Sequence, residues 1–251
     1  FSSLLGLVCG GIGESSSTNP NIITSLDVSQ NTNLWELKCS DIQLNSLMLG
    51  GGLVEIECCF NLLNSLDVSQ CVYLNTLSCW GNTISHLNVS KNINLKSLKL
   101  GWGAPPFSFG NLITELDLTQ NVLLDELNCN DNQLTCLNVK NGNNQNFTQF
   151  TIVNNPDLTC IEVDDPIWAT TNLIYIDPQS SFSDDCGNPC FAMNIKEKGK
   201  IKFNIYPNPF FQSTTIELPS EPHTLAIFDI VGNKVREVQA NGTTVIERGN
   251  L

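Results

Sequence analysis

The chain has 251 residues, a length that suits one long domain or two ordinary ones. An apolar content of 41% is sufficient for a continuous core, and 12 basic against 25 acidic residues give a formal net charge of −13 at pH 7. Such an acidic chain repels phosphate backbones and anionic membrane surfaces, so we expect no nucleic-acid partner. No run of 18 apolar residues occurs, so we expect no membrane insertion.

Residues 1–21 begin with an apolar octet that no basic residues precede, so the segment is not a complete signal peptide. We predict that it is an N-terminal cap or the remnant of a leader. A different and regular pattern begins after it, at residue 22.

Residues 22–163 consist of short half-units, best seen in 63–83, which reads LNSLDVSQCVY and then LNTLSCWGNT. Each half-unit has the pattern L-x-x-L-x-Φ, where Φ is apolar, and two half-units make a period near 21 residues. A fixed period of this length predicts a solenoid. The central apolar residues of the half-units are Leu26, Leu37, Leu47, Ile56, Leu66, Leu77, Leu87, Leu98, Leu116, Leu127, Leu137, Phe150 and Ile161.

The Φ residue follows each central residue by two positions, and residues two apart point to the same side of a strand. We therefore predict one short strand in every half-unit, with one face buried. Each 21-residue coil then contributes two strands, which run parallel to those of the coils above and below. The predicted fold class is mainly β: a solenoid with parallel strands on two sides.

The pattern in 23–31, 34–41 and 124–132 resembles leucine-rich repeats, in the 21-residue form found in secreted proteins of Bacteroidota-type bacteria. The resemblance covers residues 22–163. It implies a curved parallel solenoid that is used for binding, and it names no ligand.

One group of the 11 cysteines occupies the inward Φ position and is predicted to stack as a column of small buried residues. Its members are Cys39, Cys58, Cys79 and Cys129. Zinc is the alternative, but a straight ladder does not place four ligands in a tetrahedron, so we expect no metal there. Cys59, an outward neighbour of Cys58, and Cys71, which stands where other repeats have Asn, are expected to be plain thiols.

Four further cysteines, Cys136, Cys160, Cys186 and Cys190, lie near and beyond the end of the repeats. Cys136 and Cys160 share one register in neighbouring coils. We predict a disulfide within this group, between Cys136 and Cys160 or from Cys160 to Cys186. It would hold the last coils together where stacking support ends.

The two strand faces differ in their outward residues. Beside Val at Φ stand short polar residues such as Asp67 and Ser69, which can hydrogen-bond to turn amides and are predicted to be structural. The other face varies from coil to coil, with the pairs Lys38/Ser40, Glu57/Cys59, Ser78/Trp80, Lys99/Gly101 and Asn128/Asn130. We expect Trp80 to be exposed and the binding surface to lie on this variable face.

The largest break in the period lies between Leu98 and Leu116 and admits residues 101–111, GWGAPPFSFGN. Its two prolines prevent this segment from joining a ladder. Its aromatic residues either pack back on the core or are presented to a ligand, with Trp80 and Trp102 as a stacking platform for a sugar ring or a peptide. The candidate ligand-binding residues are therefore Trp80, Lys99, Trp102, Phe107 and Phe109.

Residues 164–186 resemble the segment that closes such bacterial arrays, and we predict that they cover the open end of the core. The aspartate pairs at 164–165 and 184–185 lack the spacing of a calcium loop, so no metal is expected. Residues 187–202 become Lys-rich and are predicted to be a linker.

Residues 203–251 contain alternating runs at 215–218, 224–229 and 234–238, which predict an antiparallel β-sandwich. The segment closely resembles the type A C-terminal sorting domain of the type 9 secretion system. The resemblance rests largely on a motif formed by Tyr206, Pro207, Asn208, Pro209, Phe210, Asp229 and Gly232. It implies passage through the periplasm, contact with the translocon and a sortase, and a secreted or cell-surface location. Family members continue through further strands, so we expect this sorting domain to be incomplete.

An enzyme needs a constellation of reactive groups, and the sequence contains none that we recognise. The histidines, His86 and His223, lie in different modules, and no nucleophile elbow, zinc-protease motif or phosphate loop occurs. We therefore expect no catalysis and no cofactor. The leading hypothesis is a secreted surface protein that binds protein or glycan ligands in adhesion or recognition. The alternative is a structural element of the surface or matrix that associates with itself.

Overall fold

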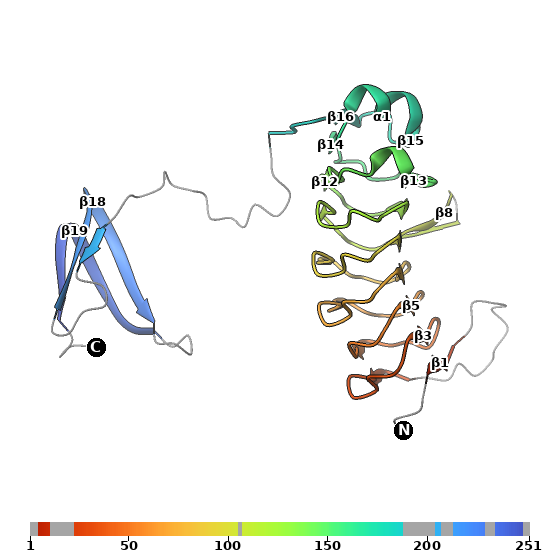
Figure 1. The fold of residues 1–251 in the computed structure, drawn as a ribbon, viewed down its shortest axis with the longest axis horizontal. Helices are drawn as coiled ribbons and strands as arrows, with labels where there is room; N and C mark the ends of the chain where they lie inside the picture. The colour runs from red at the N-terminus through yellow and green to blue at the C-terminus, as the bar shows by residue number, and fades with distance from the viewer. Residues whose placement is uncertain are drawn as a thin grey trace. The chain divides into compact units, whose positions relative to one another are not determined.

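The computed structural model describes residues 5–10, 23–104, 107–187, 204–206, 213–228 and 234–247. The chain divides into two compact units, Phe1–Ala192 and Met193–Leu251, and the division falls within the predicted linker. The first unit is a stack of coils, which confirms the predicted solenoid (Figure 1). The second is a small antiparallel sheet.

One side of the solenoid is an eight-stranded parallel sheet, called here the long sheet. Its strands, in spatial order, are β1 (Gly6–Val8), β3 (Glu36–Lys38), β5 (Glu55–Glu57), β6 (Thr76–Ser78), β7 (Ser97–Lys99), β11 (Glu126–Asn128), β13 (Gln149–Ile152) and β15 (Tyr175–Ile176). The register aligns the central residues of successive coils, for example Leu77 with Leu98 and Leu98 with Leu127. These central residues are buried, so the core is a column between the two sides of the solenoid.

The opposite side is less regular. It contains a pair, β2 (Ser25–Asp27) and β4 (Ser46–Met48), and a four-stranded sheet of β10 (Glu115–Asp117), β12 (Cys136–Asn138), β14 (Cys160–Glu162) and β16 (Ser181–Ser183). The strands predicted around Leu66 and Leu87 do not form, although both side chains are buried. The stretch of this side that lacks strands lies between two coils of irregular length. A short coil precedes Leu66, and the coil that follows Leu87 is lengthened by the insertion.

The described part of the N-terminal segment, residues 5–10, already belongs to the ladder. Leu7 pairs with Leu37, and the backbone N–H of Cys9 donates to the carbonyl of Lys38 at 2.9 Å. Leu7 and Cys9 therefore take the central and Φ positions of a coil that precedes the first predicted one.

Buried asparagines join five pairs of neighbouring coils at the turn that follows the long sheet. The side-chain amide of Asn82 donates to the carbonyls of Cys58 (3.0 Å) and Cys79 (2.9 Å), and its oxygen accepts from the N–H of Leu63 (3.0 Å). The same role in other coils belongs to Asn61, Asn111, Asn132 and Asn155. These bonds satisfy backbone groups that the turn would otherwise bury without partners.

The turn on the opposite side of the solenoid contains a second column of buried asparagines. Asn92 donates to the carbonyls of Val68 (3.0 Å) and Cys71 (2.8 Å), and Asn121 donates to those of Val89 (3.1 Å) and Asn92 (2.9 Å). Cys71, predicted to be a plain thiol in an asparagine position, is free and buried, and its sulfur lies 3.5 Å from the carbonyl of Gly50. The thiol is thus a weak substitute for the missing amide.

The predicted cysteine column is present. Cys39, Cys58, Cys79 and Cys129 are free and fully buried, and Cys9 stands in the same register. Burial raises the pKa of Cys39 to about 12, and it also raises the pKa values of the other three buried thiols well above their ordinary value. Cys59, expected to face outward, is also fully buried, and burial raises its pKa to about 12.

The last coil contains α1 (Pro166–Asn172), whose N-cap Asp165 accepts from the N–H groups of Ile167 and Trp168, both at 3.0 Å. A disulfide joins Cys160 to Cys186, with 5.9 Å between their Cα atoms, which confirms one of the two predicted pairings. Because Cys160 is bonded to Cys186, the alternative pairing of Cys136 with Cys160 is wrong. Cys136 is itself disulfide-bonded. Cys190 lies outside the described residues.

The second unit is a three-stranded antiparallel sheet of β17 (Asn204–Tyr206), β18 (Ser213–Phe228) and β19 (Lys234–Glu247). The runs predicted at 215–218 and 224–229 belong, except for residue 229, to the single strand β18, and the register shifts between Glu217 and Pro222. This irregularity accommodates the prolines that had indicated a turn. The described residues form one antiparallel sheet here and not the two that a sandwich contains.

We expect Asn82→Ala to lower the free energy of unfolding by about 1–3 kcal/mol, because it leaves the buried N–H of Leu63 without its partner. The carbonyls of Cys58 and Cys79 each keep a second bond, from Asn61 and Asn111. Urea unfolding followed by circular dichroism measures this loss. Asn94→Ala is the matched control, since Asn94 is exposed and donates only to the carbonyl of Val72, at 3.0 Å. Its effect should stay within about 0.5 kcal/mol. Equal losses in the two variants would contradict the role assigned to Asn82.

The buried thiols should make the solenoid sensitive to alkali. Their folded-state pKa values, about 12 for Cys39 and about 11 for Cys71, lie above the ordinary value of 9.0. Their contribution to stability is therefore complete below pH 9 and is lost as the pH rises towards these folded values. Urea unfolding between pH 7 and 11 measures the slope, and Cys79→Val, which keeps an apolar side chain, should reduce it. An unchanged slope in that variant would contradict the prediction.

Candidate binding surface

The insertion between two coils forms a β-hairpin beside the long sheet (Figure 1). Its strands are β8 (Trp102–Ala104) and β9 (Phe107–Phe109), and Trp102 pairs with Phe109. As predicted, the segment does not join the ladder, but it forms a strand pair of its own.

Two glycines allow the hairpin to leave and rejoin the coil. A Cβ atom at Gly101 would lie 2.0 Å from the carbonyl oxygen of Asn130, and one at Gly110 would lie 1.7 Å from that of Asp131. Only glycine fits against a neighbouring backbone at these distances. The ladder resumes at once, because the N–H of Gly81 donates to the carbonyl of Gly110 at 2.9 Å.

Four aromatic side chains, Phe60, Trp80, Trp102 and Phe109, form what we call the aromatic cluster. The indoles of Trp80 and Trp102 are stacked, with ring centroids 5.3 Å apart and planes inclined by 19°. Phe60 meets Trp80 edge-on at 4.5 Å and Phe109 at 4.8 Å. Trp80 is buried but stands outside the continuous core of the coils, and Phe60 is not among the half-buried residues that pack against that core. The aromatic cluster is thus an apolar unit beside the continuous core.

The two tryptophans differ in exposure. Trp80, expected to be exposed, is only 6% exposed, whereas Trp102 is 52% exposed and Phe109 is 37% exposed. The expectation that Trp80 is exposed is therefore wrong: Trp80 forms the buried side of the stack and Trp102 the exposed side. Ligand binding by these residues stays a prediction. The side chain of Phe107 lies outside what the structure describes.

Trp80 is buried because the strands of the long sheet are too short for its position to face outward. Each central strand ends before Φ, and the residue after Φ turns against the neighbouring coils. Ser40 and Asn130 occupy this position in other coils. The hydroxyl of Ser40 accepts from the N–H of Cys59, and the side-chain oxygen of Asn130 accepts from that of Val153, both at 3.0 Å. The variable face is therefore narrower than predicted.

Phe60 was not predicted from the sequence as a site residue, and its backbone conformation is unusual. Phe60 has φ of +50° and stands in a column of left-handed residues whose other members are Asp41, Gly81, Asp131 and Asn154. Those residue types tolerate this conformation, whereas for a bulky side chain it is a marked outlier. The left-handed conformation costs an L-residue about 1–2 kcal/mol. An aromatic residue in a column of Asp, Gly and Asn was the available sequence signal.

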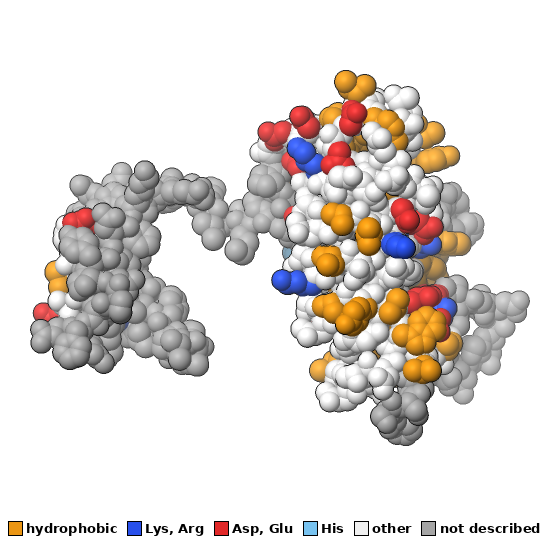
Figure 2. Space-filling model, in the orientation of Figure 1, with side chains coloured by type: hydrophobic (Ala, Val, Ile, Leu, Met, Phe, Trp, Pro, Cys, Tyr) orange, Lys and Arg blue, Asp and Glu red, His pale blue; other side chains and the backbone are white. Residues whose placement is uncertain are grey.

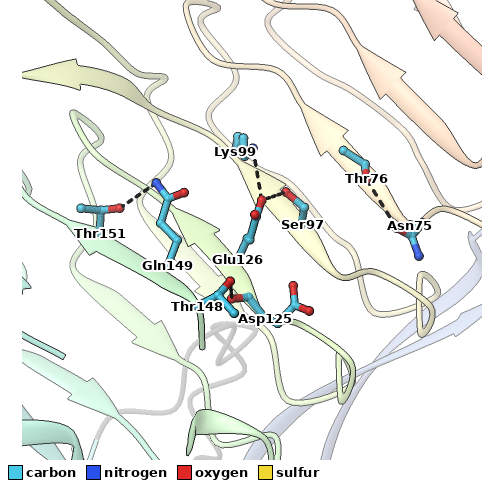
Figure 3. Close-up of polar contacts among 9 residues, drawn as sticks. All are labelled: Asn75, Thr76, Ser97, Lys99, Asp125, Glu126, Thr148, Gln149 and Thr151. Carbon is cyan, nitrogen blue, oxygen red and sulfur yellow. Dashed lines mark hydrogen bonds and ion pairs between the residues drawn. The ribbon is translucent and has the colours of Figure 1, made fainter. Parts of the chain in front are cut away.

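The outer face of the long sheet next to the hairpin is polar, and its strands carry the ion pair of Lys99 and Glu126 (Figure 3). The carboxylate of Glu126 accepts from the hydroxyl of Ser97 at 2.7 Å and lies 3.1 Å from the ammonium of Lys99. These contacts hold the pKa of Glu126 below its ordinary value. Lys99, a predicted binding residue, thus lies beside the hairpin as part of an ion pair. Uncharged residues continue the face: Thr76, Ser78, Asn128, Gln149 and Thr151.

Within the described ranges, no group of three or more His, Cys, Asp or Glu side chains could hold a metal ion. None of the helices in the described part of the chain is long and apolar enough to cross a membrane. Of the predicted sorting motif, Tyr206 lies in β17, where it pairs with Thr215 of β18. The remaining motif residues are outside the described ranges: Pro207, Asn208, Pro209, Phe210, Asp229 and Gly232.

Comparison with known proteins gives one match to a family model, for the secretion system C-terminal sorting domain, over residues 204–249. No curated protein matches the chain. A similar solved structure is the functional domain of InlJ from Listeria monocytogenes, which includes a cysteine ladder. The identity is 26%, the TM-score is 0.43, and the match covers 72% of this chain but only 43% of the InlJ chain.

The family match covers the region that the resemblance had identified. The assignment of an export signal therefore no longer depends on single motif residues. The repeats, the buried leucine columns and the parallel strand ladder define the first unit. The chain therefore joins a leucine-rich repeat solenoid to a C-terminal sorting domain, which directs it through the type 9 secretion system to the cell surface or the outside.

Proposed function

We propose that the solenoid is a non-catalytic recognition module of this secreted protein and that it binds a glycan through the aromatic cluster. The observation that carries the proposal is the tryptophan pair: Trp102 is half exposed, while its stacking partner Trp80 is buried. An indole fixed in this way offers a flat apolar face at little cost in conformational freedom.

A sugar fits this surface better than a protein does. The apolar face of a pyranose ring can stack on one indole, and its hydroxyls can exchange hydrogen bonds with the hydroxyl and amide groups of the adjoining sheet. The core of a protein interface is more extended and more apolar, whereas the residues beside this hairpin are polar and include the pair of Lys99 and Glu126. The negative net charge of −13 favours an uncharged glycan over an acidic one.

The test is binding of the secreted protein to immobilised neutral hexasaccharides of glucose, mannose, galactose and N-acetylglucosamine, with polygalacturonate and heparin as acidic comparators. We expect at least one neutral ligand to bind, and Trp102→Ala to weaken it by about tenfold or more through loss of stacking. The exposed position is substituted because removal of the buried Trp80 would test folding as well.

Trp35→Ala is the matched control, because Trp35 is 45% exposed on another coil and should not affect glycan binding. Equal affinities of the Trp102→Ala variant and the wild type would contradict the assigned site. Capture of a protein by the same surface, with no glycan bound, would contradict the ligand class.

A second candidate function is self-association, and a different surface favours it. The turn after the second asparagine column carries exposed apolar residues on successive coils: Val72, Tyr73, Ile93, Val122 and Leu123. Figure 2 shows apolar side chains recurring from coil to coil on the face in view. Two copies related by a twofold axis could pack this stripe against itself, because a twofold contact uses the same patch on both partners.

Sedimentation velocity tests this second function. We expect dimers to form as the protein concentration rises at physiological salt, and Val122→Lys to weaken the association by about tenfold by placing a charge in the contact. Ile167→Lys is the control, since Ile167 is 85% exposed on α1, away from the stripe. A strict monomer at every concentration would rule out self-association by this route.

A further inference from the structure

Phe60 combines an unfavourable backbone conformation with a position at the base of the aromatic cluster. Its φ of +50° is shared with the Asp, Gly and Asn residues that hold the same place in other coils. A bulky residue retained in such a conformation points to a function of its side chain, because an Asn or Gly would fit the turn more easily.

The contacts of Phe60 lead to the binding surface and not to the core. Its ring meets Trp80 of the next coil at 4.5 Å and Phe109 of the hairpin at 4.8 Å, both edge-on. Phe60 does not belong to the described core and does not pack against it. It therefore connects the coil that carries Trp80 to the hairpin that carries Trp102.

The neighbouring coil leaves space for this ring. Gly81 follows Phe60 in the left-handed column, and a Cβ atom there would lie 3.0 Å from Cδ1 of Phe60 and 3.3 Å from its backbone nitrogen. The N–H of Phe60 still donates to the carbonyl of Trp80 at 3.0 Å, so the ladder bond is kept while the ring turns towards the cluster.

We infer that Phe60 is a positioning residue of the glycan site: its ring fixes the stack of Trp80 and Trp102 and holds the hairpin against the coil. This inference rests on the proposed function, because a fixed stack matters for recognition only if Trp102 contacts the ligand. If position 60 served stability alone, Asp, Gly or Asn, the residues found elsewhere in the column, would give a more stable turn.

The test compares Phe60→Asn with Phe147→Asn in the full chain. Asn is the residue at position 154 of the same column, so the first substitution relieves the backbone while it removes the ring. Phe147 is also half-buried and contacts one aromatic ring, that of Phe150 at 5.1 Å, but its φ of −58° is ordinary. Thermal unfolding, the circular dichroism band of the coupled indoles and affinity for the neutral hexasaccharides are measured for both.

We expect Phe60→Asn to lower the melting temperature less than Phe147→Asn does, to lose at least half of the indole band, and to weaken glycan binding about tenfold. Phe60→Tyr, which keeps the ring, should retain the band and the affinity. An unchanged indole band in Phe60→Asn would overturn the inference, and so would a melting temperature that falls as far as in Phe147→Asn with affinity intact.

The failure of the two proposals can be distinguished. If the wild type binds none of the hexasaccharides, the proposed function fails, and the indole band still decides whether Phe60 positions the stack. If the wild type binds through Trp102 and Phe60→Asn binds equally well, only the role of Phe60 is wrong.

Discussion

Five successive turns after the long sheet, from Asn61 to Asn155, depend on a buried side-chain amide that hydrogen-bonds to the backbone of two coils at once. A sharp turn leaves N–H and C=O groups facing the interior, and asparagine offers two donors and an acceptor on a short stem. In the last coil a different residue accepts from backbone N–H groups of the turn before it. There the carboxylate of Asp177, which can only accept, takes the N–H groups of Asn154 (2.8 Å) and Asn155 (2.6 Å).

The hydrogen-bonded stack of coils explains how a small aromatic site can have a fixed position on a narrow solenoid. The coils form one apolar column, and the aromatic cluster lies outside it, so the site can vary without disturbing the core. The cluster is positioned instead by ladder bonds on either side and by ring contacts within it. The charged groups on the adjoining strands are paired, so the surface next to Trp102 offers hydrogen bonds without a strong local field.

The features that repeat could be predicted from the sequence. The buried leucines, the parallel register and the column of cysteines follow from a period of about 21 residues, because each coil meets the same neighbours. The features that depend on one position could not. Trp80 was expected to be exposed because alternation was extended beyond the end of a three-residue strand. Phe60 was missed because its significance lies in a backbone angle, and the strand at Leu7 because its single half-unit lies before the repeats begin.

The two glycines that flank the hairpin separate the evolution of the site from that of the scaffold. Gly101 and Gly110 let the chain leave the coil and return to it against the backbone of Asn130 and Asp131, and the ladder closes across them. Any segment that begins and ends at these two points meets the same frame, whatever lies between. A lineage could therefore exchange the hairpin as a cassette and acquire a new specificity, while the buried asparagines and leucines remained under their own selection.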